Sequence, residues 1–177
     1  MEPTEIAGLL KERFPMEVKE VTEFRGQVSI TVKRERIKEI LRFLHDAPEL
    51  SFDYLEDLCG VDYLSKKEPR FEVVYHLYSM EHRKRIRIKA EVSEDDCAID
   101  SVVNIWEGAD WHERECFDMF GIVFKGHPDL RRILMPEDWE GYPLRKDYPV
   151  EGPEEKWRGF VEVLRKAEDF KKFELKG

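Results

Sequence analysis

His112 and Cys116 lie four residues apart in a segment, residues 111–120, whose spacing predicts a helix. Residues four apart share a helical face, so an imidazole and a thiol would stand side by side. Together with His127 they could ligate zinc or iron, which needs three or four converging ligands. Because the chain has no matching second pair, we favour a small buried cysteine and a hydrogen-bonded histidine. A Cys–His nucleophile is less favoured still, since no third group is evident to orient it.

Three carboxylates occupy the same predicted helix, namely Glu113, Glu115 and Asp118. Carboxylates in such proximity can serve as a general acid and a general base. Three arginines are close to them in the sequence: Arg114, Arg131 and Arg132. Ion pairing among these groups is the simpler account, because clusters of opposite charge are usually structural.

Motifs of the common cofactor sites are missing from the sequence. It contains no GxGxxG after a predicted strand, no GxxxxGK[ST], no GxSxG and no CxxC pair. These motifs mark dinucleotide sites, P-loops, serine hydrolases and many cysteine-ligated centres. We therefore expect no cofactor, no metal and no catalytic residue in this chain.

The charge and the cysteines narrow the class of protein. A net charge of −9 is repelled by phosphate backbones, so we expect no nucleic-acid partner. Three cysteines without a CxxC pair favour a reducing compartment. The sequence has no apolar run that resembles a signal peptide or a membrane span. Any attachment to a membrane is therefore expected to be indirect.

Hydrophobic periodicity predicts an α+β core domain over residues 1–124, with helices packed on a mainly antiparallel sheet. The predicted helices cover residues 4–14, 37–44, 51–60, 99–106 and 111–120. The predicted strands cover residues 17–24, 27–32, 71–77 and 86–92, with a turn at 79–84. Arg85, Arg87 and Lys89 form a basic stripe on the last strand, which is either a solvated face or a docking face for an acidic partner.

The chain changes character after Phe124. Residues 125–153 contain five prolines but also many large apolar side chains. Such a segment cannot form a regular element, yet it is too apolar for an idle linker, so we predict an extended partner-binding arm. Helical spacing returns in residues 154–177, through Trp157, Phe160, Val161 and Leu164, and predicts a C-terminal helix.

One long motif joins the last predicted helix of the core to this arm. It runs from Glu113-Arg114-Glu115 through Asp118 and Met119-Phe120 to the segment GIVFKGHPDLRRIL at 121–134, and GYPLRKDYP follows at 141–149. This pattern resembles the signature of the C subunit, the 30 kDa-type subunit, of respiratory NADH:quinone oxidoreductase (complex I). The segment 60–63 and the hairpin at 71–92 are also similar to that family, so the resemblance covers nearly all of the chain.

The resemblance implies a non-redox scaffold subunit in the peripheral arm of this proton-translocating enzyme. FMN and iron–sulfur clusters, which pass electrons from NADH to quinone, would then be in partner subunits. The D subunit would be the closest partner and the B and I subunits its neighbours, on the cytoplasmic face of the bacterial inner membrane. The positions matching the family signature, or expected at a partner interface, are Glu113, Arg114, Glu115, Asp118, Gly121, Phe124, Gly126, His127, Pro128, Leu130, Arg131, Arg132, Leu134, Tyr142, Pro143, Arg145, Lys146 and Asp147.

A physical role for the motif follows as a hypothesis. Gly121 would end the helix, and Gly126 and Pro128 would turn the chain out of the domain. The arginines could bond carboxylates of their own chain or of a partner. Replacing Arg131 and Arg132 with alanine is then expected to weaken assembly more than folding.

Two other functions stay open from the sequence. The equivalent subunit of a related membrane-bound hydrogenase, a formate hydrogenlyase or an F420H2 dehydrogenase would look similar. A stand-alone metal-binding enzyme using His112, Cys116 and His127 belongs to a different class.

Overall fold

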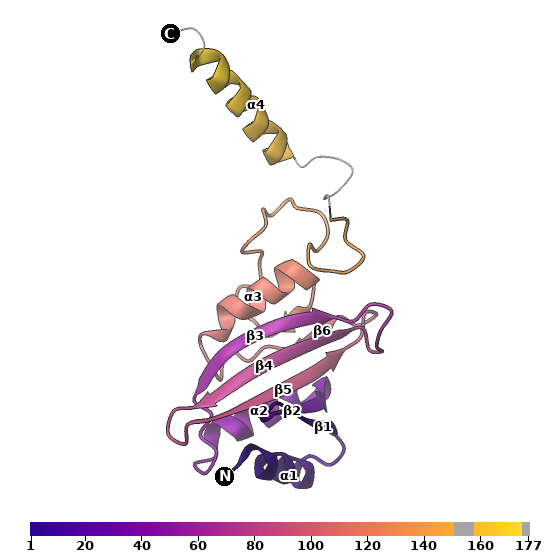
Figure 1. Cartoon of the computed structure of the whole chain (residues 1–177), viewed down its shortest axis with the longest axis vertical. Coiled ribbons are helices and arrows are strands. Elements are labelled where there is room, and N and C mark those ends of the chain that lie inside the picture. The colour runs from indigo at the N-terminus through magenta and orange to yellow at the C-terminus, as the bar shows by residue number, and fades with distance from the viewer. Residues whose placement is uncertain (151–157, 175–177) are drawn as a thin grey trace.

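The computed structural model describes residues 1–150 and 158–174 of the chain (Figure 1). The helices are α1 (Pro3–Arg13), α2 (Ile37–Asp46), α3 (Ala109–Phe120) and α4 (Arg158–Glu174), with a short 3-10 helix η1 (Arg34–Arg36). The strands are β1 (Val18–Phe24), β2 (Gln27–Lys33), β3 (Tyr54–Asp62), β4 (Phe71–Ser79), β5 (Lys84–Val92), β6 (Ala98–Asp100) and β7 (Val123–Lys125).

Five strands form one sheet in the order β1-β2-β5-β4-β3. The pairs β1–β2, β3–β4 and β4–β5 are antiparallel, and β2–β5 is parallel. Strands β6 and β7 make a separate parallel pair. Figure 1 shows α1 and α2 below the sheet and α3 beside β3. The predicted α+β class with a mainly antiparallel sheet is confirmed.

The core forms where α1 and α2 cover the sheet. Ile37, Ile40, Leu41 and Leu44 recur at helical spacing in α2, and all four are fully buried. Each buried side chain of this size contributes on the order of 1.5–3 kcal/mol to folding. Alternate residues of β4, such as Tyr75, supply the opposite side of the same core.

The predicted helix over residues 51–60 is wrong, because β3 occupies this segment. The strand pairs with β4 along its whole length, and a register irregularity lies between Leu55 and Asp57. This bulge shifts the alternation, so Leu55, Leu58 and Asp62 are the buried residues of β3. Their spacing of three and four resembles that of a helix, which explains the error.

The predicted helix over residues 99–106 is also wrong. The segment begins in β6, which pairs with β7, and continues as turns in which Val102 O accepts the N–H groups of Ile105 and Trp106. Trp106 is buried, and its indole N–H donates to Phe52 O at 3.2 Å. The apolar side chains of this segment, Ile99, Val102 and Trp106, are therefore buried in the core although the segment is not a helix.

The predicted helix that Gly121 terminates is confirmed as α3. Gly121 adopts φ +75°, a left-handed conformation that glycine reaches without strain, and its N–H bonds Phe117 O at 2.8 Å. The helix packs on β3 at Gly60, where an added Cβ would lie 2.6 Å from the Phe120 ring. β3 and α3 therefore approach so closely at Gly60 that a residue with a Cβ would not fit there.

Residues 126–150 contain no helix or strand, and their contacts are described with the site below. Helix α4 lies in the segment where a C-terminal helix was expected, and its residues 161–168 are exposed. The last part of the predicted arm, 151–153, and the start of the predicted helix, with Trp157, lie outside the described residues. Among the residues that the structure describes, no helix is long and apolar enough to cross a membrane.

The basic stripe of β5 has partners on the other strands of the sheet. Arg85 pairs with Glu56 at 2.9 Å. Arg87 donates to the side chains of Gln27 and Ser29 on β2, and Lys89 lies 3.9 Å from Glu72. These contacts account for the stripe within the chain, and a docking role stays a prediction.

Candidate functional site

Asp118 anchors the C-terminal arm to the core domain. Its Oδ2 accepts the backbone N–H groups of Ile133, Leu134 and Met135 at 3.0, 2.7 and 2.8 Å. Its Oδ1 accepts a hydrogen bond from Arg132 at 2.7 Å, and the carboxylate is fully buried. Burial acts to raise the pKa of Asp118, but these hydrogen bonds outweigh it and lower the pKa below its ordinary value. One side chain thus fixes three successive residues of the arm.

Arg132 extends this anchor further along the arm. Besides Asp118, it donates to Trp139 O at 2.9 Å and to Gly141 O at 3.0 Å. Its guanidinium also lies over the Tyr142 ring, 5.4 Å from the centroid. The planar guanidinium, with its five N–H donors, can bond a helix residue and two arm carbonyls at once.

The other two arginines of the motif lie differently. Arg114 of α3 donates to the carbonyl oxygens of Arg131 and Arg132 at 3.2 and 3.1 Å. The Arg131 side chain is 61% exposed and pairs with Asp129 at 2.9 Å. Arg114 therefore holds the arm backbone, whereas the Arg131 guanidinium points to solvent.

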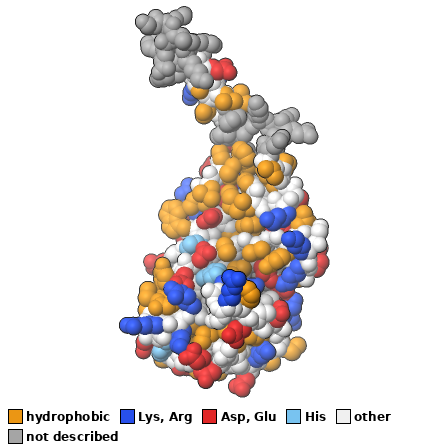
Figure 2. Space-filling view, in the orientation of Figure 1, with side chains coloured by type: hydrophobic (Ala, Val, Ile, Leu, Met, Phe, Trp, Pro, Cys, Tyr) orange, Lys and Arg blue, Asp and Glu red, His pale blue; other side chains and the backbone are white. Residues whose placement is uncertain are grey.

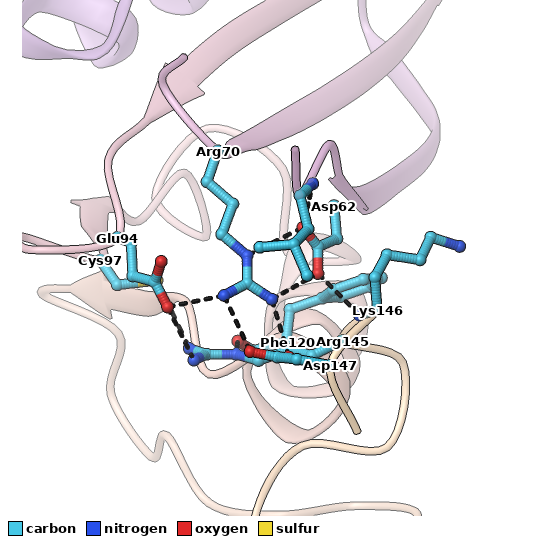
Figure 3. A network of polar contacts seen from close by, with 9 residues as sticks. Asp62, Arg70, Glu94, Cys97, Phe120, Arg145, Lys146 and Asp147 are labelled. Atoms are coloured by element: carbon cyan, nitrogen blue, oxygen red, sulfur yellow. Dashed lines mark hydrogen bonds and ion pairs between the residues drawn. The ribbon is translucent and has the colours of Figure 1, made fainter. Parts of the chain in front are cut away.

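A second anchor holds the arm at Asp147, and Figure 3 shows its network. The nearly buried Arg70 donates to both oxygens of Asp62, at 2.9 and 2.7 Å. The same guanidinium bonds Asp147 at 2.8 Å and Glu94 at 2.6 Å. Asp62 also accepts the backbone N–H of Lys146 at 2.8 Å. Arg70 and Asp62 of the core thus bond two successive arm residues, Asp147 and Lys146.

Burial alone would raise the pKa of Asp62, but the bonds from Arg70, Lys146 and Leu64 lower it to about 2. The pKa of Asp147 is lowered chiefly by its bond to Arg70. Both carboxylates are therefore ionised at neutral pH, which maximises their attraction to the guanidinium.

Arg145 and Leu144 fasten the arm to the end of α3. Arg145 Nε donates to Phe120 O at 2.7 Å, and the Leu144 N–H donates to Met119 O at 3.1 Å. These bonds satisfy carbonyl groups that the end of a helix leaves without partners. An added Cβ on Gly121 would lie 2.5 Å from the Tyr142 ring, so the arm also packs closely there.

The remaining residues predicted for the site have separate places. Phe124 is buried, Leu130 packs against the core, and Gly126 adopts φ +82°. Leu134 is 59% exposed. Pro128 and Pro143 belong to the irregular segment, and Glu115 is an exposed residue of α3. Sequence reasoning did not select Asp62, Arg70 or Glu94, because nothing local marks a contact between Arg70 and a residue 77 positions away.

Glu113 is buried, and no lysine or arginine in the described part of the chain pairs with it as Arg132 pairs with Asp118. Its Oε1 accepts the Val102 N–H at 2.7 Å, so it ties α3 to the turn after β6. Burial raises the pKa of Glu113 to about 7. The folded protein consequently holds a proton here that the unfolded chain releases at lower pH.

Glu113→Gln is expected to flatten the dependence of stability on pH. The proton on Glu113 stabilises the fold fully below about pH 4.5, and this contribution is lost as pH rises to about 7. The loss is on the order of 3 kcal/mol, which the uncharged glutamine does not undergo. Urea denaturation across this range measures it, with Glu115→Gln on the exposed face of α3 as the control. A wild-type slope retained in Glu113→Gln would contradict the assignment.

The three ligands proposed from the sequence do not form a metal site. His127 Nε2 lies 3.2 Å from Asp110 Oδ1, His112 Nδ1 lies 3.5 Å from Asp57 Oδ1, and Cys116 is buried. Within residues 1–150 and 158–174, the group of metal-capable side chains is a different one, formed by Asp57, Cys59 and His76.

Fold and site together define a class of protein: an α+β domain whose irregular C-terminal arm is fastened by buried carboxylates and arginines. The family described as "Respiratory-chain NADH dehydrogenase, 30 Kd subunit" matches residues 30–154. The chain belongs to this family, as the resemblance of its motif predicted.

Curated relatives agree with this assignment. The C subunit of NADH-quinone oxidoreductase from Roseiflexus sp. (strain RS-1) is 57% identical over 146 residues, which are 82% of this chain and 83% of that protein. The C subunit of the same enzyme from Citrifermentans bemidjiense is 54% identical over 145 residues, 82% and 88% of the two chains.

Solved structures match the fold as well. A trypsin-resistant fragment (1–134) of Nqo5 is 33% identical with a TM-score of 0.60, covering 71% of this chain and 98% of the fragment. A chain of the archaeal membrane-bound sulfane sulfur reductase has a TM-score of 0.67 at 24% identity, covering 92% and 91%. The second likeness concerns the fold alone.

Proposed function

We propose that this chain is the C subunit, a non-redox scaffold, in the peripheral arm of a proton-translocating NADH-quinone oxidoreductase. The complex transfers electrons from NADH through FMN and iron–sulfur clusters, held by its other subunits, to quinone. Family membership supports the parent enzyme, since the named relatives are the C subunit of that complex. The scaffold role rests on the anchored arm.

The arm has the construction of a preformed binding surface. Its backbone is bonded to three core side chains, Asp118, Arg114 and Asp62, so we expect it to be ordered before any partner arrives. Fixing a binding segment in advance reduces the conformational entropy that association must remove. Buried ionic contacts of this kind define geometry more reliably than they add stability.

Apolar side chains remain exposed around this anchored backbone. Figure 2 shows hydrophobic side chains gathered at the end of the domain where α3 and the arm lie. The large exposed apolar residues of α3, β7 and the arm include Trp111 at 62%, Val123 at 42%, Leu134 at 59% and Leu144 at 52%, and Val150 is fully exposed. Exposed apolar groups that cluster on a protein surface mark contact sites. We infer that the D subunit covers this surface, with the B and I subunits nearby, on the cytoplasmic face of the bacterial inner membrane.

Purification of the tagged chain from its native membranes tests the proposed function. Mass spectrometry is expected to find the B, D and I subunits together with the flavin- and NADH-binding subunits. Recovery of hydrogenase subunits would assign the chain to a related complex instead. Recovery of the chain alone would contradict the scaffold role.

Arg131→Ala and Arg132→Ala are expected to have different effects, because the two side chains have different partners. Arg131→Ala should change the free energy of unfolding by less than about 0.5 kcal/mol, as is usual at exposed positions. The amount of the D subunit that co-purifies with the Arg131→Ala chain after a salt wash should nevertheless fall several-fold. Arg132→Ala should lower both stability and recovery, since it removes bonds to Asp118 and the arm.

The control is Arg42→Ala, which changes an exposed arginine on α2. Thermal unfolding of each purified chain and quantitative co-purification from membranes give the two readouts. Recovery of the D subunit with Arg131→Ala equal to that with Arg42→Ala would exclude the Arg131 guanidinium from the interface.

A further inference from the structure

Three side chains with metal-ligating atoms meet on the face of the sheet opposite to the core. Asp57 and Cys59 belong to β3 and His76 to β4, and one ligand atom of each lies within 4.8 Å of the other two. Asp57 is paired with His76 in the antiparallel register. Cys59 is two residues further along β3 and therefore projects from the same face. Strand pairing alone brings the three groups together.

The geometry points to a binding site for a zinc-type divalent ion at Asp57, Cys59 and His76. A thiolate, an imidazole and a carboxylate form a donor set that borderline ions such as Zn²⁺ prefer over Mg²⁺ or Ca²⁺. Three protein ligands leave a fourth position for water or another ligand. This site is separate from the arm anchors and independent of the proposed scaffold function.

The distances suit such an ion after small side-chain rotations. Zinc bond lengths of about 2.0–2.3 Å place the ligands of a tetrahedral site roughly 3.3–3.7 Å apart. All three residues are partly exposed, and the Asp57 side chain is 50% exposed. An ion can therefore enter from solvent, and the ligands have space to close around it.

His112 lies beside Asp57, one of the three ligands. It reaches the cluster from α3, with Nδ1 at 3.5 Å from Asp57 Oδ1. A histidine that contacts a ligating carboxylate orients that ligand, as outer contacts of metal sites commonly do. The helix and both strands thus contribute to one surface site.

The charges around the cluster leave a small acidic excess, which the ligand Asp57 supplies once Glu56 is matched with Arg85 and Glu115 with Arg87. Asp57, Glu56 and Glu115 are the acidic groups that act on Cys59 or His76. Arg87 is the opposing cation, but its guanidinium is directed to Gln27 and Ser29 on β2. Arg85 is neutralised by its bidentate contact with Glu56.

The thiol ligand predicts how binding depends on pH. Sulfur ligates a zinc-type ion as the thiolate, so the ion must displace the proton of Cys59, and its affinity should rise with pH.

Titration of the reduced full chain with Co²⁺, a spectroscopic substitute for Zn²⁺, tests the site. We expect visible bands of a tetrahedral ion and a near-ultraviolet sulfur-to-cobalt charge-transfer band, both removed by added Zn²⁺. Cys59→Ser should abolish the charge-transfer band, whereas the matched control Cys97→Ser should retain it. His76→Gln and Asp57→Asn should each weaken binding at least tenfold.

Circular dichroism of each variant establishes that the fold is retained. Absence of a charge-transfer band in the wild-type chain, or its persistence in Cys59→Ser, would overturn the proposal. Unchanged Co²⁺ affinity in both His76→Gln and Asp57→Asn would show that the Cys59 thiol binds cobalt by itself. That result would also overturn the proposal.

Discussion

Asp118→Ala is expected to lower the free energy of unfolding by roughly 3–5 kcal/mol and to detach the arm from the domain. The substitution removes the acceptor of three backbone N–H groups and the counter-charge of Arg132. A fully buried donor left without an acceptor costs about 1–3 kcal/mol. These three bonds are partly buried, so each donor costs less than that, and the loss of the counter-charge of Arg132 adds to the total. No other single side chain described for this chain fixes so much of the arm.

Urea denaturation measures the stability loss, and limited proteolysis followed by mass spectrometry measures the release of residues 126–150. Asp129→Ala is the matched control, because Asp129 is a carboxylate of the arm that is 62% exposed and pairs only at the surface with Arg131. An exposed pair contributes at most about 1 kcal/mol. Equal stability losses in the two variants would show that Asp118 is not the anchor.

Arg70→Met is expected to lower the free energy of unfolding by roughly 3–5 kcal/mol, the usual effect of removing one partner of a buried ion pair. The variant keeps an apolar stem but leaves the fully buried Asp62 carboxylate without its counter-charge. It also removes the bond to Asp147, so the far end of the arm should become accessible to protease. The matched control is Arg85→Met, whose 68% exposed guanidinium also pairs with a carboxylate.

The same variant is expected to alter acid denaturation. Because the folded pKa of Asp62 is lowered from 3.8 to about 2, its contribution is present above pH 3.8 and is lost as pH falls through about 2. That contribution is about 2 kcal/mol. Denaturation curves between pH 5 and pH 2, at about half-unit steps, should show this acid-dependent loss in the wild type and in Arg85→Met. The loss should be smaller in Arg70→Met, where the bonds from Lys146 and Leu64 remain, and an undiminished loss there would contradict the pairing.

Some elements could be predicted because their determinants are local. Alternating apolar residues in β4 and β5 and the helical spacing of α2 are complete within single segments. Gly121 ends α3 for a local reason too, since the backbone conformation there favours glycine. The prediction of β3 failed because its bulge gives a strand the spacing of a helix.

The sequence by itself determined the fold class, the family and the acidic and basic residues of the motif, because periodicity and motif spacing are properties of the linear chain. Only the tertiary structure decided their partners. Register across the sheet brought Asp57 to His76, and folding of the arm brought Asp147 to Arg70. Burial acts to raise the pKa of both neighbouring carboxylates, and their bonding partners then set opposite protonation tendencies: Glu113, bonded by the Val102 N–H, holds its proton to about pH 7, whereas Asp118 is ionised by Arg132 and three backbone donors.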